Sequence, residues 1–157
     1  MMDNYDFFST FVTAVGRNDT LSTWAQVHFG SKVQVFSDLP AEDPPGADDM
    51  PYVILHTPGV AKHQERREQS YTISADLGLN KGVLATRAED NIEEQAGIEL
   101  ILDFVTIFIE AVEGALPANT SFGYTMQADT LGSLPEVYAF VDLEFIMRIT
   151  LGGDPLG

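Results

Sequence analysis

The sequence predicts an α+β domain in which helices pack on one face of an antiparallel or mixed sheet of about five strands. Three observations lead to this fold class. Residues 70–79 alternate apolar and polar side chains, residues 137–151 do so over a longer run, and residues 98–112 are apolar apart from one narrow polar stripe. Alternation is typical of a strand with one buried face, and a polar stripe along an apolar segment is typical of a helix.

Two helices are expected at the start of the chain. Apolar side chains recur at helical spacing through residues 3–15, and Gly16 follows as a suitable end. A second, shorter helix is expected at residues 20–29, with Gly30 as its end.

The next segment predicts three strands separated by loops. Residues 32–36 read as a strand, and residues 38–51 form an exposed loop because they are rich in proline and acids. The run 52–55 is apolar throughout, and the alternating run 70–79 follows it after a charged insert.

The rest of the chain predicts one long helix and two strands. After a loop at residues 80–87, the helix is expected from Ala88 to Leu116, where Pro117 stops it. Alternation then predicts strands at residues 121–129 and 137–151. The predicted order is α-α-β-β-β-α-β-β.

One domain is expected for a chain of 157 residues, because a single core commonly forms at this size. We assign residues 1–151 to this domain and residues 152–157 to a flexible C-terminal tail. The absence of cysteine excludes disulfides, thiolate metal sites and thiol catalysis.

The long helix is more apolar than contact with a sheet requires. Its remaining apolar surface should therefore be covered by something other than the sheet. We expect the N-terminal helix to cover part of it and a neighbouring subunit to cover another part. The candidate subunit-interface residues on this helix are Ile98, Ile101, Phe104 and Phe108.

The charge of the chain argues against direct nucleic-acid binding. Twenty-four acids against eight Lys and Arg give a net charge of −16, whereas phosphate contacts need basic patches. The acidity is compatible with simple solubility or with a surface that DNA passes without sticking. Charge alone does not choose between the two.

One short insert is basic on this acidic background. Residues 62–68 hold three of the eight Lys and Arg residues and only two acids. The insert reads either as an ordinary exposed hairpin tip or as an arm that docks on another copy or an acidic partner. Its candidate contact residues are Lys62, His63, Arg66 and Arg67.

The sequence contains few of the residue patterns that catalysis or metal binding requires. His56, at the end of an apolar strand, is the best candidate for a general base, but a histidine there is more often structural. The acidic loop at residues 38–49 does not have the spacing of a calcium-binding loop. We therefore expect no catalytic residues, no metal site and no cofactor, and we expect a protein that is not an enzyme.

The chain resembles the tail terminator proteins of long-tailed phages, also called minor tail or tail-completion proteins. The likeness depends mostly on Pro51-Tyr52-Val53-Ile54 at the start of the second strand and on the alternating strand of residues 70–77. It covers residues 3–151, together with the order of helices and strands.

The resemblance implies a structural virion protein. Members of this family form a ring, usually of six subunits, which caps the tail tube, ends its polymerisation and offers its other surface to the head–tail connector. The implied partners are further copies of the chain, the tail-tube protein and the connector protein. DNA would pass through without specific binding, no membrane would be involved, and the basic arm would contact the next subunit or the tube.

The implied location is the virion tail, after assembly in the cytoplasm of the bacterial host. Two alternatives remain open. The first is another head–tail neck or tail-tube component, and the second is a small non-viral ligand-binding domain or enzyme that uses His56 or the carboxylates of the long helix, Glu99, Asp103 and Glu110.

Overall fold

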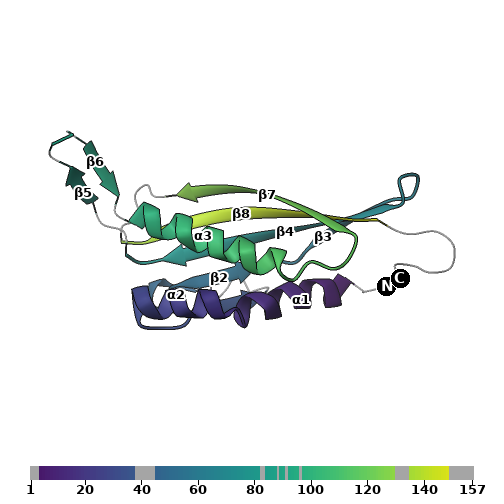
Figure 1. The fold of residues 1–157 in the computed structure, drawn as a ribbon, viewed down its shortest axis with the longest axis horizontal. Helices are drawn as coiled ribbons and strands as arrows, with labels where there is room; N and C mark the ends of the chain where they lie inside the picture. The colour runs from purple at the N-terminus through teal and green to yellow at the C-terminus, as the bar shows by residue number, and fades with distance from the viewer. Residues whose placement is uncertain are drawn as a thin grey trace.

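The computed structural model describes residues 4–37, 45–81, 84–87, 89–90, 92–95, 97–129 and 135–148. It is an elongated molecule with helices on one face of a sheet and a hairpin at one end (Figure 1). The helices are α1 (Asn4–Gly16), α2 (Asp19–Phe29) and α3 (Gly97–Glu113), with a 3-10 helix at Ala47–Asp49. The strands are β1 (Gln34–Ser37), β2 (Tyr52–Leu55), β3 (Gly59–His63), β4 (Glu68–Leu79), β5 (Leu84–Arg87), β6 (Ile92–Gln95), β7 (Thr120–Asp129) and β8 (Val137–Arg148).

The main sheet is mixed and has the strand order β1-β2-β4-β8-β7, with β3 also paired to β4. Among the described strand pairs of this sheet, only β1–β2 is parallel. β2 pairs with the C-terminal part of β4, from Ala75 to Gly78, and β3 pairs with its N-terminal part, from Glu68 to Thr72. The two short strands therefore follow one another along the same edge of β4, while β7 forms the opposite edge of the sheet.

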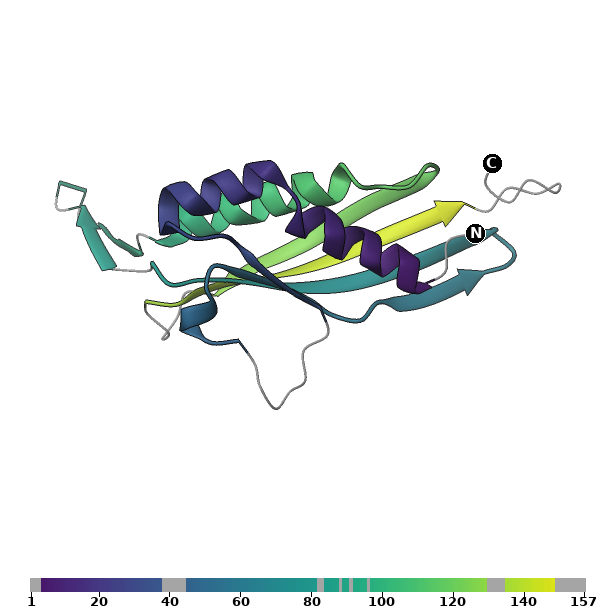
Figure 2. The same cartoon turned by 90° about the horizontal axis from the view of Figure 1, so that it is seen from below.

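All three helices lie on one face of the sheet (Figures 1 and 2). α3 contacts β4, β8 and β7, and α1 and α2 both contact α3. The expectation that the N-terminal helix helps to cover the long helix is thus confirmed, and α2 shares that role. The predicted α+β class is also confirmed, with six strands in the main sheet where about five were expected.

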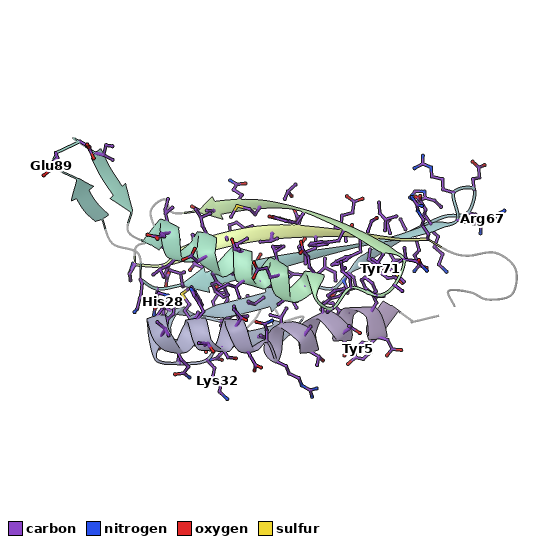
Figure 3. The ribbon with its side chains drawn as sticks, viewed as in Figure 1. Tyr5, His28, Lys32, Arg67, Tyr71 and Glu89 are labelled. Atoms are coloured by element: carbon purple, nitrogen blue, oxygen red, sulfur yellow. The ribbon has the colours of Figure 1, made fainter. Side chains whose placement is uncertain are left out.

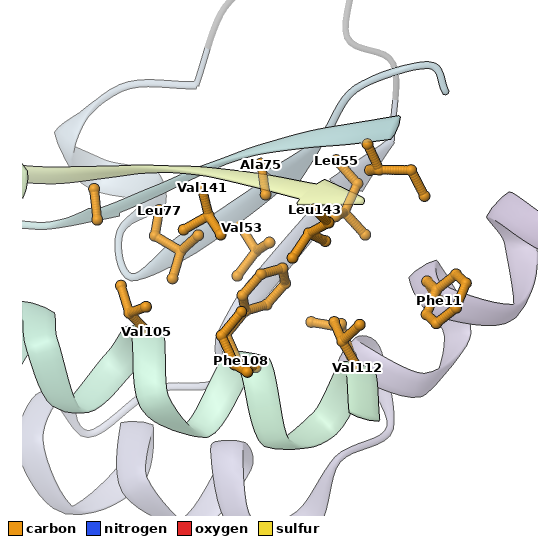
Figure 4. Packing of buried hydrophobic residues seen from close by; sticks show 14 of the residues in the cluster. Phe11, Val53, Leu55, Ala75, Leu77, Val105, Phe108, Val112, Val141 and Leu143 are labelled. Atoms are coloured by element: carbon orange, nitrogen blue, oxygen red, sulfur yellow. The ribbon is translucent and has the colours of Figure 1, made fainter. Parts of the chain in front are cut away.

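The core lies between the helices and this face of the sheet (Figure 4). The alternate residues of β4 and β8 point into it, as the sequence pattern predicts. Aromatic rings dominate its contacts: Phe7 stacks on Tyr71 with ring centroids 3.9 Å apart, and Trp24 lies 4.8 Å from Phe104. Each large apolar side chain buried in this way contributes about 1.5–3 kcal/mol to folding.

Local signals fix the ends of α2. The side chain of Asn18 accepts a hydrogen bond from the Leu21 backbone N–H at 2.8 Å, which caps the N-terminus. Gly30 ends the helix with a φ of 66°, a left-handed conformation in which glycine carries no steric penalty. Lys81, beyond the end of β4, donates to the carbonyl of His28 and so satisfies one more group in the last turn.

The start of α3 was predicted wrongly. The sequence pattern placed it at Ala88, but the helix begins at Gly97, and residues 92–95 belong to β6. Glycine is unfavourable inside a helix, so Gly97 marks a natural boundary. The pairing of β5 with β6 was not expected from the sequence, and neither was β3. The expected C-terminal tail, residues 152–157, lies outside the described residues.

The second face of the sheet carries a small apolar cluster over Gly78. Met50, Tyr52 and Ile54 are buried there, with Tyr138 packed against them. Tyr52 lies directly opposite Gly78 in the register, and a Cβ added to Gly78 would lie 2.8 Å from Cζ of the Tyr52 ring. Gly78 therefore provides the space that the Tyr52 ring occupies.

We expect Gly78→Ala to lower the free energy of unfolding by about 1–3 kcal/mol, because the Tyr52 ring and the Met50 side chain must shift. Chemical denaturation monitored by circular dichroism measures this change. Gly123→Ala is the matched control, since Gly123 lies in β7 with nothing within 4 Å of an added Cβ. A Gly78→Ala protein as stable as the control would contradict this packing.

Candidate functional surfaces

The candidate basic arm forms the end of the β3–β4 hairpin. Lys62 and His63 are the last residues of β3, and Arg66 and Arg67 lie in the turn that follows. We call these four residues the basic tip. All four are exposed, and the tip projects from one end of the molecule, where Figure 3 labels Arg67. The arm predicted from the sequence is therefore accessible to a partner.

The backbone of the tip is held in a tight turn. The Arg67 N–H donates to the Gln64 carbonyl at 3.2 Å, and Arg67 has a φ of 53°. This left-handed conformation favours glycine, asparagine or aspartate over arginine. Arginine at this position keeps a charged side chain at the end of the hairpin despite the local backbone cost.

The candidate interface on the long helix needs correction. Ile101, Phe104 and Phe108 are fully buried against the protein's own sheet and helices, so they cannot meet another subunit. Of the four candidates only Ile98 reaches the surface, with 39% of its area exposed. Leu102, one helical turn later, is 44% exposed. The sequence pattern identified the apolar residues of the helix but could not tell which of them α1 and α2 cover.

A polar cluster lies on the open face of the sheet, the face opposite α1, α2 and α3 (Figure 2). His56 Nε2 is 2.9 Å from Asp76 Oδ2, and Ser74 donates to Asp142 at 2.7 Å. His56 was the histidine singled out from the sequence; its partner was not predicted, because pairing Asp76 with it requires the strand register. The Ser74 proton is directed to Asp142 and away from His56. The cluster therefore does not form a nucleophile–base pair.

Most of the charged side chains on the open face along β4, β8 and β7 are acidic. The register places Asp76, Asp142, Glu144 and Asp129 on it, and Arg148 is the basic residue of β8 on the same face. A hollow of about 270 Å³ lies beside Gly123 and is lined in part by Asp142 and Glu144. An acidic surface of this kind repels phosphate.

Burial and carboxylates raise the pKa of two tyrosines at one end of this face. Burial has the largest effect on the pKa of Tyr138, followed by the hydrogen bond of 2.9 Å that its hydroxyl donates to the Glu136 carboxylate. The charges of Tyr52 and Glu136 add to this, and the pKa rises to about 12. Burial, and then the charges of Asp76, Glu136 and Asp49, raise the pKa of Tyr52. Both hydroxyls are thus stabilised in their protonated form.

Part of the acidic loop considered for a metal site is described. Asp48 and Asp49 lie in the 3-10 helix, where Asp49 accepts a hydrogen bond from the Gly46 backbone N–H. The loop acids Asp38, Glu42 and Asp43 lie outside the described residues. Among the residues that are described, no three His, Asp or Glu side chains are grouped closely enough to hold a metal ion.

No protein-family model matches the chain, and no curated protein sequence matches it either. Within the described part of the chain, no helix has both the length and the apolar character needed to span a membrane.

The raised pKa of Tyr138 predicts a loss of stability in strong alkali. The pKa of Tyr138 is about 12 in the folded protein, whereas its ordinary value is 10.0. Its contribution to the free energy of unfolding is therefore complete below pH 10 and is lost as the pH rises through 12. We expect the free energy of unfolding to fall over this range, and to fall less steeply in Tyr138→Phe. Denaturation curves at several pH values measure both slopes; identical slopes in the two proteins would contradict this assignment.

Proposed function

We propose that this chain is a structural subunit of a phage tail, which closes into a ring and caps the tail tube in the manner of a tail terminator. The observation that carries the proposal is a pair of hairpins, β3–β4 and β5–β6, which project from opposite ends of an elongated body (Figure 1). Projections at both ends suit contacts in which each copy touches the next one head to tail. Such contacts generate a ring when the rotation between copies closes.

The β5–β6 hairpin supports this proposal because its strands do not join the main sheet. It pairs as a separate two-stranded sheet and stands away from the main body (Figure 1). An isolated two-stranded hairpin is at best marginally stable in water. Contact with a neighbouring copy would stabilise it.

Two further surfaces suit a ring around a DNA passage. β7 is an edge strand of ten residues, and a long edge offers backbone groups to another chain. The open face of the sheet is acidic, so DNA could pass it without being retained. On this proposal the ring ends tube growth and presents its other side to the head–tail connector.

The mass of the purified protein tests this proposal. We expect native mass spectrometry to give one discrete oligomer, with six times the 17.2 kDa monomer mass as the most abundant species. Added to assembling tail-tube protein, the ring should shorten the tubes. A monomer at high protein concentration would contradict the proposal, and open-ended polymers of this chain alone would indicate a tube subunit.

A further inference from the structure

The two projecting hairpins carry opposite charge. The basic tip supplies Lys62, Arg66 and Arg67, with Glu65 and Glu68 as the only acids beside them. The β5–β6 hairpin, which we call the acidic hairpin, has four acids and one basic residue in its twelve positions. Figure 3 labels Arg67 at one end of the molecule and Glu89 at the other.

The charges at both ends are accessible. Arg66 and Arg67 are exposed at the basic tip, and Glu89 and Asp90 are exposed in the acidic hairpin between β5 and β6. Arg66 and Arg67 are thus available to a partner.

We infer that the acidic hairpin of one copy binds the basic tip of the next copy, an inference that rests on the proposed ring. The complementary groups belong to the same chain and lie at opposite ends, so each copy has both halves of a repeating contact. This arrangement is heterologous, which is the kind of interface that closes rings. It also replaces repulsion by attraction at the point of contact, although copies with a net charge of −16 repel one another over the rest of their surfaces.

A second copy fits the basic tip better than nucleic acid does. Glu65 and Glu68 reduce the charge of the tip, and residues 62–68 contain no Phe, Tyr or Trp to stack on bases. Exposed ion pairs stabilise weakly, so their main effect here is to select orientation and register. The apolar surfaces and backbone edges of adjoining copies supply the rest of the affinity.

Charge reversal at each end tests this contact. The tip variant is Arg66→Glu with Arg67→Glu, and the hairpin variant is Glu89→Lys with Asp90→Lys. Each variant alone should raise the dissociation constant of the oligomer at least tenfold, as measured by native mass spectrometry over a dilution series. Because each variant then has two ends of like charge, its copies repel end to end.

Recombining the reversed ends should restore assembly. An equal mixture of the two variants should form rings in which they alternate, and a chain that carries all four substitutions should form rings by itself. Arg17→Glu with Lys32→Glu is the matched control, since both residues are exposed and the change in net charge equals that of the tip variant. This control should assemble like the wild type, and circular dichroism should show native folding in every variant.

The outcomes separate the two proposals. A wild-type chain that stays monomeric would overturn the ring and the contact together. If the wild type forms a ring and each double variant alone still forms it, the hairpin contact is wrong but the ring is not. The same holds if neither the mixture nor the chain with four substitutions restores assembly.

Discussion

The structure depends on the burial of α3 against the sheet. Phe104 and Phe108 are fully buried, and the inward residues of β4 and β8 meet them from the other side (Figure 4). α1 and α2 flank α3, so one continuous core joins the N-terminal helices to the strands at the C-terminal end of the chain. With this face sealed inside one subunit, the surfaces left for other molecules are the open face, the edge strands, the two hairpins and the outer sides of the helices, where Ile98 and Leu102 are exposed.

The sequence predicts best those elements whose periodicity reflects burial on one side. β4 and β8 alternate because one face packs on helices and the other does not. The same logic fails for β5, which the sequence placed in a loop, and for β6, whose short charged segment fits a helix as well as a strand. The error at Ala88 arose in this way, although Gly97 offered a local signal for the true helix start.

The candidate surfaces could be predicted only in part. The basic tip is visible in the sequence as a local excess of charge, and the structure shows it exposed at one end. Its acidic counterpart is hidden in the sequence, because acids are common throughout this chain and only the fold places a group of them at the opposite end. The pairing of His56 with Asp76 likewise depends on strand register, which periodicity alone does not fix.

Zero-length cross-linking with a carbodiimide tests the head-to-tail contact most directly, because it joins a lysine to a carboxylate only when the two touch. The account predicts that peptides from the cross-linked oligomer join Lys62 of one copy to Glu89 or Asp90 of another. Mixing isotopically labelled with unlabelled protein shows that the link lies between copies. Oligomers in which Lys62 is never joined to the acidic hairpin would contradict the account.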